Sequence, residues 1–186
     1  MTSPAGTDLR FTTGSIPARI NAGRTHDVIQ PTGPAQVWLP AGEAYATVDA
    51  NSAAGTLIVP HMTFRGIPVT NLRVTFESGR ITNLDAETNG QMIREFLEAS
   101  SPEAKHLSIV DVGVNPHSHT VEGSHYNSWE MGGMVTLAVG NNSWAGGTNG
   151  SDAALSFHLA DATLTIGDTS IVRNGDLQSQ LLAESP

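Results

Sequence analysis

The chain has 186 residues, a formal charge of −9 and no cysteine, and this length suits one domain with its own core. The missing cysteines exclude disulfides, thiolate zinc sites and cysteine nucleophiles, so a metal would need His, Asp, Glu, Tyr or water. The acidic balance argues against a nucleic-acid partner, and the lack of a long apolar run or a signal-peptide pattern predicts a cytoplasmic protein with no membrane partner.

The first half of the chain is predicted to form short strands joined by turns, in keeping with its 19 glycines and 10 prolines. Residues 8–13 predict a first strand, and the turn-rich segment 14–40 is expected to wrap over other elements. Apolar residues at every second position of 72–77 predict a half-buried antiparallel strand. Further strands are expected at 56–60 and, after a turn containing Gly79, at 81–86.

The second half contains the only strong helix pattern. Thr88 and Gln91 have the spacing of a capping box, and the apolar residues that follow lie on one helical face, which predicts a helix at about 88–99. Ser101 and Pro102 indicate a short second helical turn. We expect further strands at 107–114, 134–139, 162–166 and 170–172. The predicted fold class is therefore α+β: a β-rich single domain over 1–186 with mostly antiparallel strands.

Several side chains are candidates for chemistry on their residue type alone. His158 and Asp161 lie beside an alternating apolar strand, where they predict a metal site or an acid/base pair. In an extended segment His117 and His119 would point the same way and grip one ion, or they would belong to a solvated polar loop that also holds Glu122 and His125. His106 is either a ligand or a partner for a helix dipole.

Two further interpretations concern a pocket. Glu130 is a candidate general base or a surface charge at the start of a strand. The three tryptophans, Trp38, Trp129 and Trp144, either line a substrate pocket or anchor the core.

A series of sequence blocks carries a family resemblance. In order they are AGTDLRF (5–11), LPAGEAY (39–45), NSAAGTLIV (51–59), VTFESGRI (74–81), GVNP (113–116), MGGMVTLAVG (131–140), GGTN (146–149) and SFHLAD (156–161). This set resembles the C-terminal half of the thermophilic-type metalloaminopeptidases, which include aminopeptidases T and S. The 2,5-dihydroxypyridine dioxygenases resemble the same scaffold.

The resemblance implies metal ligands at particular positions. Glu43 matches the ligand glutamate of the LPxGE block, and His158 matches the histidine of a His-x-Asp motif. The aspartate of that motif falls on Ala160, so Asp161 lies one position late. Another family glutamate aligns two residues before Asp111. A two-residue offset along a strand keeps a side chain on the same face of the sheet, so Asp111 is a possible replacement ligand.

Two further family ligand positions are occupied by residues that do not fit. The expected histidine falls on Thr136 and the expected tyrosine on Ser143, so the surviving set suits one metal better than two.

These matches lead to three alternatives for function. The first is a metal-dependent hydrolase of the aminopeptidase type, complete or degenerate, that uses a zinc-, cobalt- or manganese-activated water on a peptide-like substrate. The second is a mononuclear Fe(II) ring-cleaving dioxygenase acting on a hydroxylated aromatic or pyridine, with His158, Asp161 and a histidine from 106, 117 or 119 as its triad. The third is a non-catalytic dimerising scaffold. The resemblance also implies a homodimer and the absence of the family's N-terminal domain.

Overall fold

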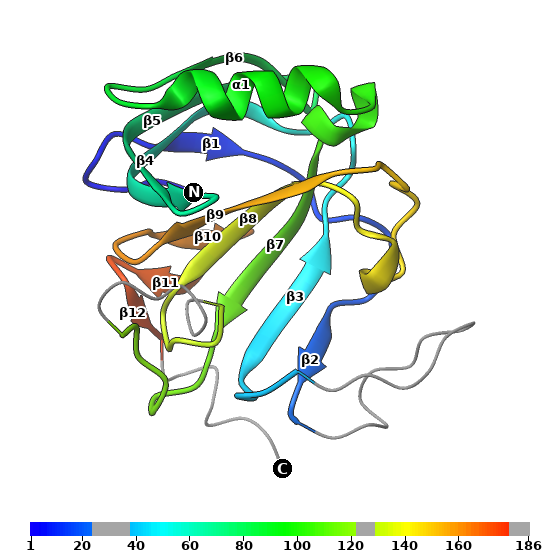
Figure 1. Cartoon of the computed structure of the whole chain (residues 1–186). Helices are drawn as coiled ribbons and strands as arrows, with labels where there is room; N and C mark the ends of the chain where they lie inside the picture. The colour runs from blue at the N-terminus through cyan, green and yellow to red at the C-terminus, as the bar shows by residue number, and fades with distance from the viewer. Residues whose placement is uncertain (24–37, 122–128, 179–186) are drawn as a thin grey trace.

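The computed structural model describes residues 1–23, 38–121 and 129–178, which form three antiparallel sheets and one main helix (Figure 1). A four-stranded sheet has the order β1-β4-β5-β6, a five-stranded sheet β2-β3-β7-β8-β9 and a small sheet β10-β11-β12. The elements are β1 (Asp8–Arg10), β2 (Arg19–Asn21), β3 (Glu43–Thr47), β4 (Ala54–Phe64), β5 (Ile67–Glu77), β6 (Arg80–Asp85), α1 (Gly90–Ala99), η1 (Pro102–Lys105), β7 (Leu107–Gly113), β8 (Val135–Gly140), η2 (Ser143–Ala145), β9 (Ala154–Leu159), β10 (Leu164–Ile166), β11 (Thr169–Arg173) and β12 (Asp176–Leu177).

The four-stranded sheet is built around the long β4–β5 hairpin, and α1 lies along β5 and β6 (Figure 1). Leu72, Val74 and Phe76 are buried while the residues between them face outward or sit half-buried, as the alternation in the sequence predicts. Gly79 has φ +82°, and a Cβ there would meet the Ala50 carbonyl oxygen at 1.7 Å, so the β5–β6 turn requires glycine.

Helix α1 begins two residues later than predicted. Asn89 occupies the N-cap position with a left-handed backbone, and no side chain caps the helix. Thr88 instead hydrogen-bonds to Thr70 Oγ1 at 2.8 Å, so its spacing to Gln91 does not form the expected capping box. Ile93 and Leu97 are buried against the sheet, which confirms the helical face read from the sequence.

The five-stranded sheet has two faces of opposite chemistry. One face points into the main core through apolar side chains such as Val110, Leu137 and Phe157, which are paired across β7, β8 and β9. Leu164 and Val172 of the small sheet join this same core. The other face carries polar side chains, which are described below, together with a small buried apolar cluster that includes Tyr45, Ile109 and Ala138.

The predicted fold class is confirmed: the domain is β-rich, mostly antiparallel and has one main helix. The strands β2, β3, β9 and β12 and the short helix η2 were not predicted. For β3 the reason is that Glu43–Thr47 resembles a polar turn in sequence. In the part of the chain that the structure describes, no helix has the length and apolar character needed to span a bilayer.

A buried acidic cavity on the five-stranded sheet

A row of polar side chains crosses the five-stranded sheet from edge to edge. Strand pairing places Arg19 opposite Tyr45, Tyr45 opposite Asp111, Asp111 opposite Thr136 and Thr136 opposite His158. Directly paired residues project from the same face of a sheet, so these five side chains, one from each strand, share one face. We call this set the polar row.

Asp111 lies at the centre of the polar row and is completely buried. Neither of its carboxylate oxygens has a hydrogen-bond partner within the described structure. Burial raises the pKa of Asp111 well above its usual range, and the negative charges of Glu43 and Glu130 raise it further. A buried carboxylate without hydrogen-bond partners is costly unless a cation is placed beside it.

Glu43 lies on β3 two residues before Tyr45, so its side chain points to the same face. The Asn21 side chain of β2 donates a hydrogen bond to Glu43 Oε1 at 3.2 Å and a second to the Trp38 carbonyl at 3.0 Å. Burial raises the pKa of Glu43 from 4.5 to about 7; the Glu130 carboxylate adds to the rise, and the Asn21 hydrogen bond opposes it.

Glu130 reaches the site from the segment before β8, which crosses closely over the end of β7. The Asn115 amide donates to the Glu130 carbonyl at 2.9 Å, and the Gly133 amide donates to the Gly113 carbonyl at 2.9 Å. A Cβ on Gly113 would lie 2.0 Å from the Met131 carbonyl oxygen, so this approach requires glycine. Burial raises the pKa of Glu130, and its Oε2 atom has no partner in the described structure.

A cavity of about 320 Å³ opens beside these acids. All three tryptophans line it, together with Glu43 and Glu130; the other lining residues are Ala138, Asn141, Ala154 and Ser156. Trp144 packs on Tyr45 with ring centroids 5.1 Å apart, and Trp129 meets the His158 ring edge-on at 5.3 Å. The pocket interpretation of the tryptophans therefore agrees with their placement, and we call this space the acidic cavity.

His158 ends the polar row on β9, where Thr136 Oγ1 lies 2.8 Å from its Nδ1 atom. This hydrogen bond and the contact with Trp129 fix the orientation of the imidazole ring. Thr136, the residue that occupies an expected ligand position, thus holds His158 in place.

Three predicted ligands do not join this cluster. Asp161 is exposed in the turn after β9, because the strand ends at Leu159 and the one-residue offset is not corrected by a bulge. His117 and His119 are exposed in the segment after β7, where the His119 ring lies 3.1 Å from the His117 carbonyl.

His106 forms no part of the cluster either. It follows η1, and its Nδ1 lies 2.8 Å from the Ala50 carbonyl. Glu122 and His125 lie outside the described residues. Within 1–23, 38–121 and 129–178, no three His, Asp or Glu side chains form a group able to hold a metal ion.

Three site residues escaped the sequence analysis: Arg19, Asn21 and Tyr45. The signal that points to Tyr45 is the alternation of Glu43, Tyr45 and Thr47 with two alanines, which is a strand pattern with its polar side buried. Arg19 and Asn21 lie on the neighbouring strand β2 and have no comparable signal. Prediction from hydrophobic alternation expects polar side chains to be exposed, so it misses a strand whose polar side chains are buried.

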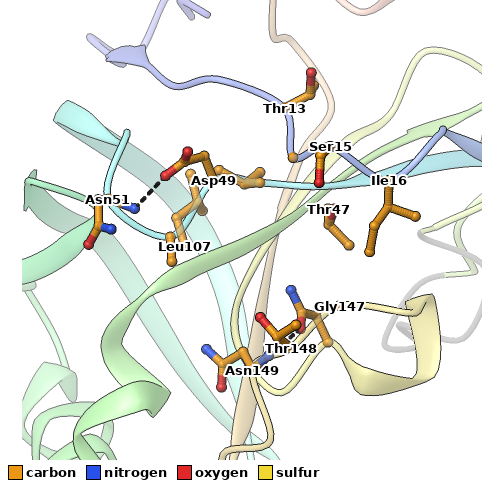
Figure 2. A pocket seen from close by; sticks show the side chains of 14 residues that line it. Thr13, Ser15, Ile16, Thr47, Asp49, Asn51, Leu107, Gly147, Thr148 and Asn149 are labelled. Carbon is orange, nitrogen blue, oxygen red and sulfur yellow. Dashed lines mark hydrogen bonds between the residues drawn. The ribbon is translucent and has the colours of Figure 1, made fainter.

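A second cavity, of about 500 Å³, lies near the far ends of β3 and β7 (Figure 2). Hydroxyl and amide side chains line it, including Thr13, Thr47 and Asn149. Asp49, the one carboxylate among its described lining residues, accepts a hydrogen bond from the Asn51 amide at 2.9 Å. The described residues that line this cavity include no histidine, buried acid or aromatic side chain, so they lack the chemistry of the acidic cavity.

Buried acids with raised pKa values beside an aromatic-lined cavity define an enzyme-type site. The comparison with known families specifies it further: the model of the 2,5-dihydroxypyridine 5,6-dioxygenase family matches residues 1–179. The chain belongs to that family.

Solved structures share the fold at low sequence identity. The chain is similar to 2,5-dihydroxypyridine dioxygenase from Pseudomonas putida KT2440, with a TM-score of 0.73, 20% identity, and coverage of 95% of this chain and 53% of that one. It is also similar to AmpT from Thermus thermophilus, with a TM-score of 0.66, 18% identity, and coverage of 95% and 48%. The chain thus spans about half the length of each. No curated protein sequence matches it significantly.

The leading prediction from the sequence, an aminopeptidase-type hydrolase, is wrong. The family model and the dioxygenase structure favour the second alternative, and the similarity to AmpT is weaker. The error arose because the two families resemble one scaffold, and the LPxGE block was read as the hydrolase version of it.

Proposed function

We propose that the chain acts as a metal-dependent dioxygenase that cleaves the ring of a small hydroxylated heteroaromatic molecule. The observation that carries this proposal is the match of the family model over residues 1–179. The acidic cavity supports it, because its volume of about 320 Å³ lies at the small end of ligand pockets and suits a substrate of about one ring.

Two residues of the polar row, Asp111 and His158, are suited to bind one divalent metal ion. Both Asp111 oxygens are buried without a partner, which is the state in which a carboxylate gains most from a cation. His158 projects from the same face, and its hydrogen bond to Thr136 fixes the ring as a ligand requires. Asp111 and His158 would hold the ion, which would supply the redox chemistry that activates dioxygen.

The remaining residues of the cavity would bind the substrate and move its protons. The indoles of Trp129 and Trp144 offer apolar surfaces that exclude water from a bound ring. Glu43 and Glu130 lie where they can accept protons from substrate hydroxyl groups. With a pKa of about 7, the Glu43 carboxylate is a base matched to neutral pH.

Oxygen uptake tests the proposal directly. The purified chain, loaded anaerobically with Fe(II), should consume dioxygen when 2,5-dihydroxypyridine is added, and elemental analysis after desalting should find iron retained. Asp111→Asn should lose both the retained iron and the uptake. Asp161→Asn, which changes an exposed acid close in sequence to His158, should keep both. If the Asp111→Asn variant retains iron as well as the unmodified chain does, the ligand assignment is wrong. If the iron-loaded chain consumes no oxygen with any hydroxylated pyridine, the proposed activity is wrong.

A further inference from the structure

The second cavity, of about 500 Å³, contains a nearly buried hydroxyl group that the described protein does not use. Thr47, at the end of β3, lines this cavity and is only 5% exposed. Within the described residues, Thr47 Oγ1 has no hydrogen-bond partner. A Cβ on Gly14 would lie 2.5 Å from Thr47 Oγ1, so glycine at this position leaves the hydroxyl open to the cavity. A group that enters the cavity and bonds to this hydroxyl is therefore favoured.

Further polar groups point to the same space. Ser15 and Thr148 lie on opposite sides of the cavity, one on the segment before β2 and one on the segment after η2 (Figure 2). Their hydroxyl groups and the side-chain amide of Asn51 form no hydrogen bond with any described residue. Asp49 accepts the Asn51 backbone amide through Oδ1, which leaves Oδ2 for an incoming donor. Hydroxyl, amide and carboxylate groups thus converge on one cavity.

The wall that carries Thr148 is fixed by the protein's own hydrogen bonds. Asn142 is 5% exposed; its Nδ2 donates to the Ser108 carbonyl at 3.1 Å, and its Oδ1 accepts the Asn149 amide at 2.9 Å. The Gly147 amide donates to the Asn142 carbonyl at 3.0 Å, and a Cβ on Gly147 would lie 2.2 Å from Asn142 Oδ1. A ligand that meets such a preformed wall binds without the cost of ordering it.

The residues that line the cavity favour a neutral ligand rich in hydroxyl groups. Asp49 is the one charged residue among the described lining residues, and its negative charge repels anions. Hydroxyl groups both donate and accept, so a polyhydroxylated ligand can pair with serine, threonine and asparagine in either direction and can donate to the carboxylate. The buried apolar residues Val48 and Leu107 also line the cavity, and they match the C–H surface of a sugar ring.

We propose that the second cavity binds a neutral sugar or cyclic polyol, with Thr47 as the buried anchor and Asp49 accepting a hydrogen bond from a ligand hydroxyl. A cavity of about 500 Å³ suits a ligand of one or two rings. The site is independent of the proposed function, because neither Asp111 nor His158 lines this cavity.

Saturation-transfer difference NMR on the metal-free chain tests the binding. The neutral probes are glucose, myo-inositol and maltose, and glucuronate is the anionic counterpart of glucose. We expect saturation transfer to at least one neutral probe. Glucuronate should bind at least about tenfold more weakly than glucose because its carboxylate meets Asp49. Asp49→Asn should reduce this difference.

Thr47→Val keeps the shape of the side chain and removes its hydroxyl. The variant should bind the neutral probe about fivefold more weakly, which corresponds to one ordinary hydrogen bond. Its melting temperature should not fall, because the hydroxyl has no partner among the described residues. Thr82→Val, at an exposed position of β6, is the matched control and should leave the affinity unchanged.

A second lining variant keeps the test decisive. Ser15→Ala, at an exposed position, should also weaken the neutral probe, and it decides alone if Thr47→Val lowers the melting temperature. The proposal is overturned if none of the three neutral probes receives saturation. Binding that is indifferent to both Thr47→Val and Ser15→Ala, or glucuronate binding as tight as that of glucose, would overturn it as well. Because the chain is metal-free throughout, the result does not depend on whether the dioxygenase activity is found.

Discussion

Replacing Glu43 by Gln should stabilise the metal-free protein at neutral and alkaline pH. Burial raises the pKa of Glu43 from 4.5 in its usual environment to about 7 in the folded chain. A folded state that holds its proton more tightly than the unfolded state is favoured at low pH. The contribution of Glu43 to stability is therefore fully present below pH 4.5 and is lost as the pH rises to about 7.

The size of the effect follows from the two pKa values. Each tenfold change in proton affinity is worth about 1.4 kcal/mol, so the interval from 4.5 to about 7 corresponds to about 3 kcal/mol as an upper value. Solvent near the cavity mouth screens part of this, which leaves about 2 kcal/mol at pH 8. Glutamine keeps an oxygen that accepts the Asn21 hydrogen bond, so little else should change. The gain corresponds to a melting temperature higher by about 4–8 °C.

Urea unfolding of both proteins at pH 4, 6 and 8, with chelator present, measures the effect. The difference in free energy of unfolding should be near zero at pH 4 and should grow to its full value by pH 8. Glu103→Gln, at an exposed acid, gives the effect of the change in net charge alone. A difference that stays constant from pH 4 to pH 8, or a variant less stable at pH 8, would refute the reasoning.

Four further outcomes follow from the structure. Asp111→Asn should raise the midpoint of urea unfolding of the metal-free protein at pH 8, because burial and its acidic neighbours raise the pKa of this acid, and an unchanged midpoint would mean that its charge is compensated. Gly113→Ala should cost about 1–3 kcal/mol in urea unfolding, since its Cβ would meet the Met131 carbonyl, and a neutral result would show that the crossing segment shifts freely. Phe157→Ala, at a completely buried core position, should cost about 3–5 kcal/mol by the same assay. Asp161→Asn should stay within about 0.5 kcal/mol of the unmodified protein, and a larger loss would show that this exposed turn has a structural role.

The parts of the fold that the sequence predicts are those where polarity and exposure agree. Leu72, Val74 and Phe76 alternate with polar neighbours on β5, and Ile93 and Leu97 follow helical spacing on α1. In both elements one side is buried in the core and the other faces outward. The spacing of the apolar residues therefore predicts both the type of element and its buried face.

The candidate site was only partly predictable because its strands reverse this relation. On β3 the buried positions are Glu43, Tyr45 and Thr47, so the strand resembles a polar turn. His158 was a candidate from its residue type beside an apolar strand and again from the family motif, whereas Asp111 was found only through the resemblance, with strand parity placing it on the same face as the family ligand. Strand pairing decides which candidate residues come together in the site. The paired residues are 22 apart in sequence for Thr136 and His158 and 66 apart for Tyr45 and Asp111, and local sequence patterns do not specify such pairings.

The cost of the acidic cavity gives a physical reason to regard it as functional. Glu43, Asp111 and Glu130 are buried within one another's fields, and burial raises the pKa of each, so all three oppose folding at neutral pH. The opposite face of the same strands carries apolar residues such as Leu137, which shows that this sheet packs well without charge. Replacing buried charges with apolar groups of similar volume is often neutral or stabilising. Packing therefore does not account for the three acids, whereas a bound cation would favour their charged forms and return part of the lost stability when it binds.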